Sequence, residues 1–242
     1  MQKKQFEAFD VIGVITSCFP EKFGVPRQSG LAPAARAKLE LHPPYNRVEM
    51  VQGLEEFSHI WIQFVFHQSV AEGWKTTVRP PRLGGRKRRG VLATRSPHRP
   101  NHLGLSVVRL QGISTAAGTV VLQLGGVDLL DGTPVIDIKP YVPYCDCPAG
   151  ASDGWLQEDF PVVQIDFLPD PAAFCQDYES KTKRHLTALI QQVLQLDPRP
   201  ASQRGRRSVF GMILWDVNIR WFVDGNVYTV TACELAEVPI NK

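Results

Sequence analysis

The chain has 242 residues and a formal net charge of +3, with 43% hydrophobic and 21% charged residues. This composition excludes a disordered protein and is sufficient for one large globular domain, or for a medium domain with an appendage. The chain contains no stretch of the roughly 18 uninterrupted apolar residues that a membrane span needs, and its N-terminus lacks the apolar segment of a secretory signal. Its five cysteines form neither an even disulfide framework nor a paired zinc motif. We therefore expect a soluble cytoplasmic protein with reduced thiols, no membrane contact and no metal.

The N-terminal part predicts a strand followed by a polar loop. Residues 11–17 form a short apolar run, and residues 23–31 are rich in glycine and in residues typical of loops. Within this loop Arg27 and Gln28 follow Pro26, whose fixed φ aims them reproducibly. The loop could hold a ligand or could be only a surface turn.

Residues 59–67 predict a strand that is apolar on both faces, as in a closed barrel or a covered sheet. His67 and Gln68 lie at its polar end, where a histidine is more often only a hydrogen-bonded residue. Many short strands suggest an antiparallel or mixed barrel. Because the sequence has no Gly-x-Gly-x-x-Gly turn after a strand, a Rossmann-type nucleotide site is disfavoured. The further strand candidates are residues 91–94, 105–111, 119–126 and 135–138.

The charge is concentrated in one region. No carboxylate occurs between Glu72 and Asp128, whereas ten lysines and arginines do, which favours a polyanion or a phosphate-bearing ligand. Residues 94–106 combine two prolines, a glycine and many hydrogen-bond donors, so they predict a rigid ligand-binding loop or a turn at a barrel rim. Prolines flank Arg95 and Arg99 in this loop. The four consecutive cations before it could instead be a solvated loop or a localisation signal; they are Arg86, Lys87, Arg88 and Arg89.

A second polar motif spans residues 128–141. Asp131 and Gly132 begin a tight turn, and Thr133 adds a hydroxyl group. Asp137, Lys139 and Tyr141 then alternate on one face of the following strand. This face could be a solvated surface or, as we prefer, a wall of the same pocket.

The C-terminal part predicts a small α+β appendage. Residues 144–160 have the composition of a boundary, and a helical segment follows, with apolar residues at helix spacing between 186 and 194. A basic loop at 199–207 precedes strands at 209–215, 217–223 and 227–233, the last two joined by an Asp-Gly-Asn hairpin turn. The predicted fold is mainly β (α+β overall): a single-sheet β-barrel domain over residues 6–148 with an α+β appendage over 162–242 that serves dimerisation, RNA binding or both.

Several motifs in order resemble the TsaA-like family, in particular its bacterial tRNA-methylating members. They are Pro26-Arg-Gln, His67-Gln, Arg79-Pro-Pro-Arg-Leu-Gly-Gly, Thr94-Arg-Ser-Pro-x-Arg-Pro-Asn-x-Leu-Gly-Leu-Ser and Asp128-Leu-Leu-Asp-Gly-Thr-Pro-Val-Ile-Asp-Ile-Lys-Pro-Tyr. The resemblance covers residues 6–144, and the Asp197-Pro-Arg-Pro-Ala block with the strands after it resembles the extension of those members. The chain has His102 where members commonly have another proline.

This resemblance implies a homodimeric barrel methyltransferase that uses S-adenosylmethionine near the subunit interface. The implied substrate is tRNA whose anticodon stem-loop carries N6-threonylcarbamoyladenosine (t6A) 3′ of the anticodon, and methylation on N6 gives m6t6A. The residues implied to hold the cofactor are Pro26, Arg27, Gln28, His67, Gln68, Arg95, Leu105, Leu130, Asp131, Gly132 and Thr133.

Alignment of methyl donor and acceptor is then the main catalytic task. Because the acceptor nitrogen must lose a proton, we assign Asp137 as general base, oriented by Tyr141. Phosphate contacts are assigned to Arg86, Lys87, Arg88, Arg89, Arg99, Arg204, Arg206 and Arg207. Two alternatives stay open: a non-enzymatic RNA-binding barrel, and a barrel methyltransferase with another RNA or a small molecule as substrate.

Overall fold

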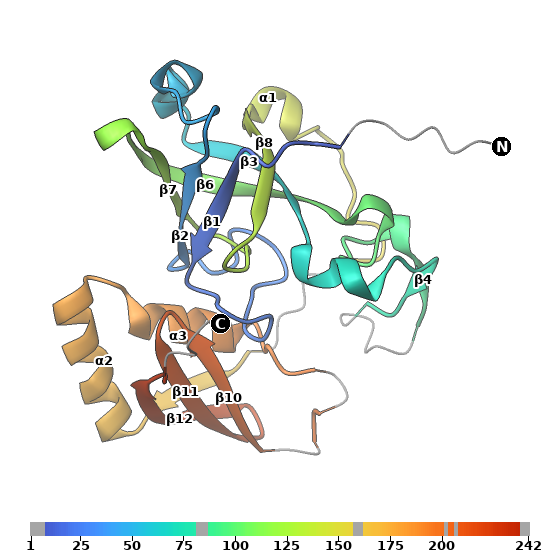
Figure 1. Ribbon diagram of the computed structural model, residues 1–242. Coiled ribbons are helices and arrows are strands. Elements are labelled where there is room, and N and C mark those ends of the chain that lie inside the picture. Colours follow the sequence, from blue (N-terminus) through green and yellow to red (C-terminus); the bar gives the residue numbers. More distant parts are fainter. Residues whose placement is uncertain (1–7, 81–86, 157–161, 201–202, 206–207, 238–242) are drawn as a thin grey trace.

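The computed structural model describes residues 8–80, 87–156, 162–200, 203–205 and 208–237. Figure 1 shows a β-barrel with a smaller α+β domain packed against it. The barrel is closed, with the strand order β1-β2-β7-β6-β3-β8 and antiparallel pairing between neighbours. The mainly β fold and the closed barrel predicted from the sequence are confirmed. The barrel strands are β1 (Gly13–Ser17), β2 (Arg36–Leu41), β3 (His59–Val65), β6 (Leu103–Ser114), β7 (Val120–Gly125) and β8 (Pro134–Pro140).

Alternation along each strand fills the barrel interior. On β3, Ile60 and Ile62 are fully buried and Phe64 is nearly so, whereas Trp61 and Gln63 on the outer face are only half-buried. Gly104 on β6 allows this packing, because a Cβ there would lie 2.3 Å from the Phe64 ring. The apolar character of both faces of β3 therefore reflects a core face and a partly covered outer face.

Short helical turns and a small hairpin connect the barrel strands. The hairpin pairs β4 (Thr77–Val78) with β5 (Arg89–Gly90). The strand predicted at residues 91–94 is wrong: the chain forms a 3-10 turn there, because the backbone N–H and the hydroxyl of Thr94 both donate to the carbonyl of Val91. The short helices are η1 (Val48–Val51), η2 (Leu54–Glu56), η3 (His67–Glu72), η5 (Val91–Ala93), η6 (Pro100–His102), η7 (Ala116–Gly118) and α1 (Pro143–Asp146).

The C-terminal domain consists of a four-stranded sheet and two helices. The sheet has the order β10-β11-β12-β9, and β9 lies parallel to β12. The predicted helical segment is two helices, because Lys183 adopts a left-handed conformation (φ 61°) that ends the first. The predicted hairpin turn at 224–226 is confirmed. The elements are β9 (Gln164–Phe167), α2 (Pro169–Thr182), α3 (Leu186–Gln195), β10 (Val209–Leu214), β11 (Val217–Asp224) and β12 (Val227–Leu235).

The C-terminal domain packs on the barrel segment that contains Pro26. Trp221 on β11 is fully buried and stacks on Phe23, with ring centroids 6.0 Å apart. The backbone N–H of Trp215 donates to the carbonyl of Cys18 at 2.8 Å, and that of Ile213 donates to the Glu21 carboxylate at 2.9 Å. The buried residues of the two domains therefore form one continuous core. Within the described ranges, no helix combines the length and the apolar character of a membrane span.

Candidate functional site

Hydrogen bonds join segments that carry the predicted cofactor residues. The guanidinium of Arg95 donates to the side-chain oxygen of Gln28, whose amide donates to the carbonyl of Arg27. The backbone N–H of Gly30 donates to the carbonyl of Gly126 at 2.7 Å, which ties the same segment to the loop before β8. The structure thus brings together three motifs that are about 30 to 100 residues apart.

The turn from Leu130 to Thr133 is held rigidly. Gly132 has φ 74° and donates its backbone N–H to the carbonyl of Ile15 at 2.8 Å. One carboxylate oxygen of Asp131 accepts the backbone N–H of Ser17 at 2.8 Å, and the buried hydroxyl of Thr133 donates to the carbonyl of Leu130 at 2.6 Å. The hydrogen bonds of Asp131 and Thr133 therefore fix the conformation of this turn and the directions of its backbone N–H and carbonyl groups.

His67 lies beside this turn. A Cβ at Gly132 would be 3.9 Å from its Nε2. Burial lowers the pKa of His67, and the positive charge of Lys22 acts in the same direction, while a backbone hydrogen bond to Val65 and the charge of Asp131 oppose them. The imidazole is therefore mainly neutral at pH 7.

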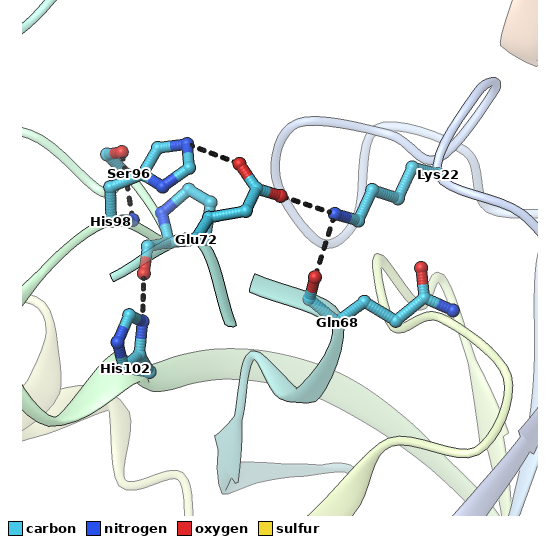
Figure 2. A network of polar contacts seen from close by, with 7 residues as sticks. Lys22, Gln68, Glu72, Ser96, His98 and His102 are labelled. Carbon is cyan, nitrogen blue, oxygen red and sulfur yellow. Dashed lines mark hydrogen bonds and ion pairs between the residues drawn. The ribbon is translucent and has the colours of Figure 1, made fainter. Parts of the chain in front are cut away.

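Glu72 links three segments around the site, as Figure 2 shows. Its Oε1 lies 3.0 Å from Nζ of Lys22, which also donates to the backbone carbonyl of Gln68 at 3.1 Å. Its Oε2 lies 3.7 Å from Nε2 of His98 in the loop that carries Arg95. The Lys22 ammonium holds the pKa of Glu72 below its usual range. The sequence did not single out Lys22 or Glu72, although Glu72 is the last carboxylate before the acid-free stretch.

His102 determines the end of this loop. It has φ 52°, which a proline cannot adopt, and Asn101 before it has φ 66°. The His102 ring nitrogen Nδ1 lies 2.9 Å from the carbonyl of Pro97 (Figure 2 shows the contact), and its backbone carbonyl accepts the N–H of Phe66 at 2.8 Å. The backbone at residue 102 therefore has a conformation that excludes proline.

Asp128 lies in the second polar motif of the sequence, but the sequence alone predicted no role for it. Its Oδ1 is buried and has no hydrogen-bond partner among the described residues. Burial raises the pKa of Asp128 to about 6, while the Ser106 hydroxyl and the charge of Arg95 act in the opposite direction. Leu105, beside Ser106 on β6, leaves 52% of its side chain exposed. One buried oxygen of the Asp128 carboxyl thus lacks a partner among the described residues, while exposed Leu105 lies on the opposite, outer face of β6.

We expect Asp128→Asn to stabilise the protein at pH 7 but not at pH 4. The pKa of Asp128 rises from 3.8 to about 6 on folding, so the stabilising proton is fully bound below pH 4 and is lost as the pH rises through 6. At pH 7 the buried charge then costs about 3 kcal/mol, which asparagine removes. Urea unfolding across this pH range measures the difference. An advantage of Asp128→Asn that is the same at pH 4 and pH 7 would contradict the assignment.

The predicted catalytic pair lies on the outer face of the barrel. Oδ2 of Asp137 accepts a hydrogen bond from the Gln63 amide at 3.2 Å. The strand register places Asp137, Gln63 and Leu105 side by side across β8, β3 and β6. Tyr141 is four residues further along, about 13 Å away on an extended strand, where its ring contacts those of Trp61 and His59. The Asp137 carboxylate therefore contacts the Gln63 amide in this structure, and Tyr141 lies further along the chain.

The predicted RNA-binding cations divide into two groups. Lys87 and Arg88 are exposed, and Arg88 donates to the Thr77 hydroxyl at 3.0 Å. Three further cations contact groups of the chain: Arg89 lies over the Trp155 ring, Arg99 donates to the carbonyl of Thr94, and Arg204 pairs with buried Asp197 at 3.1 Å. Arg86, Arg206 and Arg207 lie outside the described residues.

Two family models together match most of the chain. The tRNA-methyltransferase O N-terminal domain matches residues 14–147, and the TrmO C-terminal domain matches residues 161–236. The tRNA (adenine(37)-N6)-methyltransferase of Escherichia coli K12 is 45% identical, over 93% of this chain and 97% of that protein. A Pseudomonas aeruginosa protein named as a putative S-adenosylmethionine-dependent methyltransferase is 47% identical, over 87% of this chain and 90% of its own length.

The same family appears among solved structures. A crystal structure of TrmO from Pseudomonas aeruginosa has a TM-score of 0.78 and 37% sequence identity, and the match covers 95% of this chain and all of that one. The TsaA-like resemblance read from the motifs agrees with these matches. The chain, with its closed barrel and its C-terminal domain, belongs to the TrmO family.

Proposed function

We propose that this protein is an S-adenosylmethionine-dependent methyltransferase that methylates N6 of the adenosine at position 37 of tRNA. Its Escherichia coli relative is named for this reaction, and its Pseudomonas aeruginosa relative is named for this cofactor. The observation that carries the proposal is the Arg95–Gln28 hydrogen bond, because it unites two motifs at a single site.

The residues present fit the proposed cofactor, which carries a sulfonium, an ammonium and a carboxylate group. Asp128 supplies a buried acceptor oxygen without a partner in the described ranges, which suits a cationic or hydroxyl-bearing ligand. Arg95 and Gln28 supply donors that suit a carboxylate. S-Adenosylmethionine, when bound, supplies an activated methyl group. We propose that the residues that hold it are Pro26, Arg27, Gln28, His67, Gln68, Arg95, Leu105, Leu130, Asp131, Gly132 and Thr133.

The proposed substrate nucleoside is t6A, and the product is m6t6A. Its N6 belongs to a urea-like group with a delocalised lone pair, so the nitrogen must lose its proton as it is methylated. We propose that the Asp137 carboxylate accepts this proton, held in place by the Gln63 amide. The remaining task of the chain is alignment of the two reactants, an effect worth up to about 7–11 kcal/mol.

We further propose that the protein is a cytoplasmic homodimer that binds the anticodon stem-loop. The outer face of β3, β6 and β8 supports the dimer, because half-buried Trp61 and exposed Leu105 lie on it. A second copy covering this face would also shield the cofactor site from water. Sedimentation equilibrium measures the oligomeric state directly.

We expect the double variant Lys87→Met/Arg88→Met to weaken tRNA binding mainly at low salt. Both side chains are exposed in the basic region. Each removed cation that pairs with a phosphate should make the slope of log affinity against log salt shallower by about one, so the double variant should change the slope by about two. Binding titrations between about 50 and 200 mM salt measure this slope. The matched control, Lys38→Met/Lys181→Met, removes two exposed cations from other surfaces and should retain the wild-type slope. Equal slopes for all three proteins would contradict this role of the two cations.

Nucleoside mass spectrometry tests the proposed function. The protein is incubated with S-adenosylmethionine and with tRNA that either carries or lacks the threonylcarbamoyl group. A methyl mass added only to the modified nucleoside is the expected result. A methyl mass on unmodified adenosine would contradict the t6A substrate. No added mass, together with measurable tRNA binding, would favour a non-enzymatic RNA-binding module.

A further inference from the structure

Lys22 is a cation at the cofactor site that the proposed chemistry has not yet used. Its Nζ donates to the backbone carbonyl of Gln68 at 3.1 Å and lies 3.0 Å from Glu72 (Figure 2). Each contact uses one of the three donors of an ammonium group. Two acceptors on η3 therefore hold Lys22 in place, and its third donor can serve a ligand.

Lys22 also lines a cavity of about 220 Å³ between the two domains. The cavity has room for about seven water molecules at ~30 Å³ each, which is enough for a substituent larger than a single functional group. Its described lining contains two cations and no carboxylate, and the rest is apolar side chains and backbone. The lining residues are Lys22, Phe23, Gly24, Val25, Pro26, Arg27, Val193, Leu196 and Pro198.

This chemistry fits a ligand group that is partly apolar and carries one negative charge. The cavity shares Pro26 and Arg27 with the proposed cofactor site, so such a group would lie beside the methyl donor. A bare cation there would repel the positive sulfonium, but Glu72 compensates the charge of Lys22. The threonylcarbamoyl group of t6A has a methyl, a hydroxyl and a free carboxylate, whereas unmodified adenosine has none of these.

We propose that Lys22, positioned by Glu72, binds the carboxylate of the threonylcarbamoyl group and so selects the modified nucleotide. The inference rests on the proposed t6A methylation. One hydrogen bond between charged groups corresponds to about a 10- to 100-fold preference. The C-terminal domain contributes by closing the far side of the cavity with Val193, Leu196 and Pro198.

The test compares two anticodon stem-loop RNAs. One carries t6A, and the other carries the same group with its carboxylate converted to the amide, which keeps the shape and removes the charge. The wild-type protein should methylate the acid RNA about 10- to 100-fold more efficiently, measured as kcat/KM. Lys22→Met should lower kcat/KM by that factor on the acid RNA and by less than about twofold on the amide RNA. Lys22→Arg should recover part of the loss on the acid RNA.

Two further measurements complete the design. Lys38→Met, which removes an exposed cation from β2, should behave like the wild type on both RNAs. Glu72→Gln, which removes the ion pair of Lys22 but keeps Lys22 and its bond to the Gln68 carbonyl, should show a smaller loss confined to the acid RNA, and it tests the proposal even if Lys22→Met does not fold. Calorimetric titration with S-adenosylmethionine should give the same Kd for wild type and Lys22→Met within about twofold.

The outcomes that overturn the proposal are distinct from a failure of the proposed function. An equal loss of kcat/KM on both RNAs in Lys22→Met would contradict the proposed contact between Lys22 and the carboxylate. Equal kcat/KM of the wild-type protein on both RNAs would contradict it as well. A weaker Kd for S-adenosylmethionine in Lys22→Met would assign Lys22 to the carboxylate of the cofactor. No methylation of either RNA by the wild-type protein would instead contradict the t6A methyltransferase activity itself.

Discussion

Replacing Asp137 with asparagine is expected to slow methyl transfer about 100-fold or more, the usual worth of a positioned general base. Asparagine has nearly the same shape and can still accept the hydrogen bond that Gln63 donates to Asp137, but it cannot take the proton that leaves N6. Single-turnover methylation of t6A-containing tRNA, with enzyme and cofactor in excess, measures the chemical step. The Kd for S-adenosylmethionine should stay within about twofold of the wild-type value, because the variant keeps the strand and its pairing.

Lys139→Met is the matched control for Asp137→Asn. Its ammonium lies 3.9 Å from the Asp137 carboxylate, and the pair is largely exposed, so losing this ion pair alone should have little effect. The control therefore separates loss of an ion pair from loss of a base. If Asp137→Asn still binds the cofactor and keeps the wild-type single-turnover rate, Asp137 is not the general base. The neutral imidazole of His67 would then be the next group to test.

Replacing Trp221 with alanine is expected to destabilise the whole protein by about 3–5 kcal/mol, as for other fully buried tryptophans. Its side chain is fully buried between Phe23 and Phe210, with ring centroids 6.0 and 5.6 Å away. For a chain of this length the loss corresponds to a Tm lower by about 10 °C or more. Because Phe23 belongs to the segment that carries Pro26, the affinity for S-adenosylmethionine should fall as well. Calorimetry with and without the cofactor measures both effects.

Two neighbouring variants give this prediction its controls. Phe222→Ala changes the next residue of β11, which points to the opposite face and is 41% exposed, so it should cost less than about 1 kcal/mol. Trp221→Phe retains an aromatic ring and removes an indole N–H that has no partner among the described residues, so most of the stability should return. If Trp221→Ala gave two separate transitions with an unchanged barrel, the domains would not share one cooperative core.

Local sequence patterns were sufficient for the elements that form from neighbouring residues. Bulky residues on both faces of β3 predicted the barrel strand, and Asp-Gly-Asn at 224–226 predicted the hairpin between β11 and β12. The apolar spacing from Leu186 to Leu194 predicted α3, whose apolar face is buried. The pattern at residues 91–94 was misleading, because three apolar or β-branched residues also suit a 3-10 turn closed by the Thr94 side chain.

The sequence by itself therefore determined the mainly β fold and the motifs that belong to the site, because these depend on periodicity and on residue types within short segments. Only the tertiary structure decided which side chains meet. Lys22 contacts Glu72 across 50 residues, and the fold buries one oxygen of Asp128 without a hydrogen-bond partner among the residues that the structure describes. Strand register, not spacing along β8, brings the amide of Gln63 to Asp137. Contacts of this kind leave no periodic signal in the chain, since they arise when the barrel closes and the C-terminal domain packs against it.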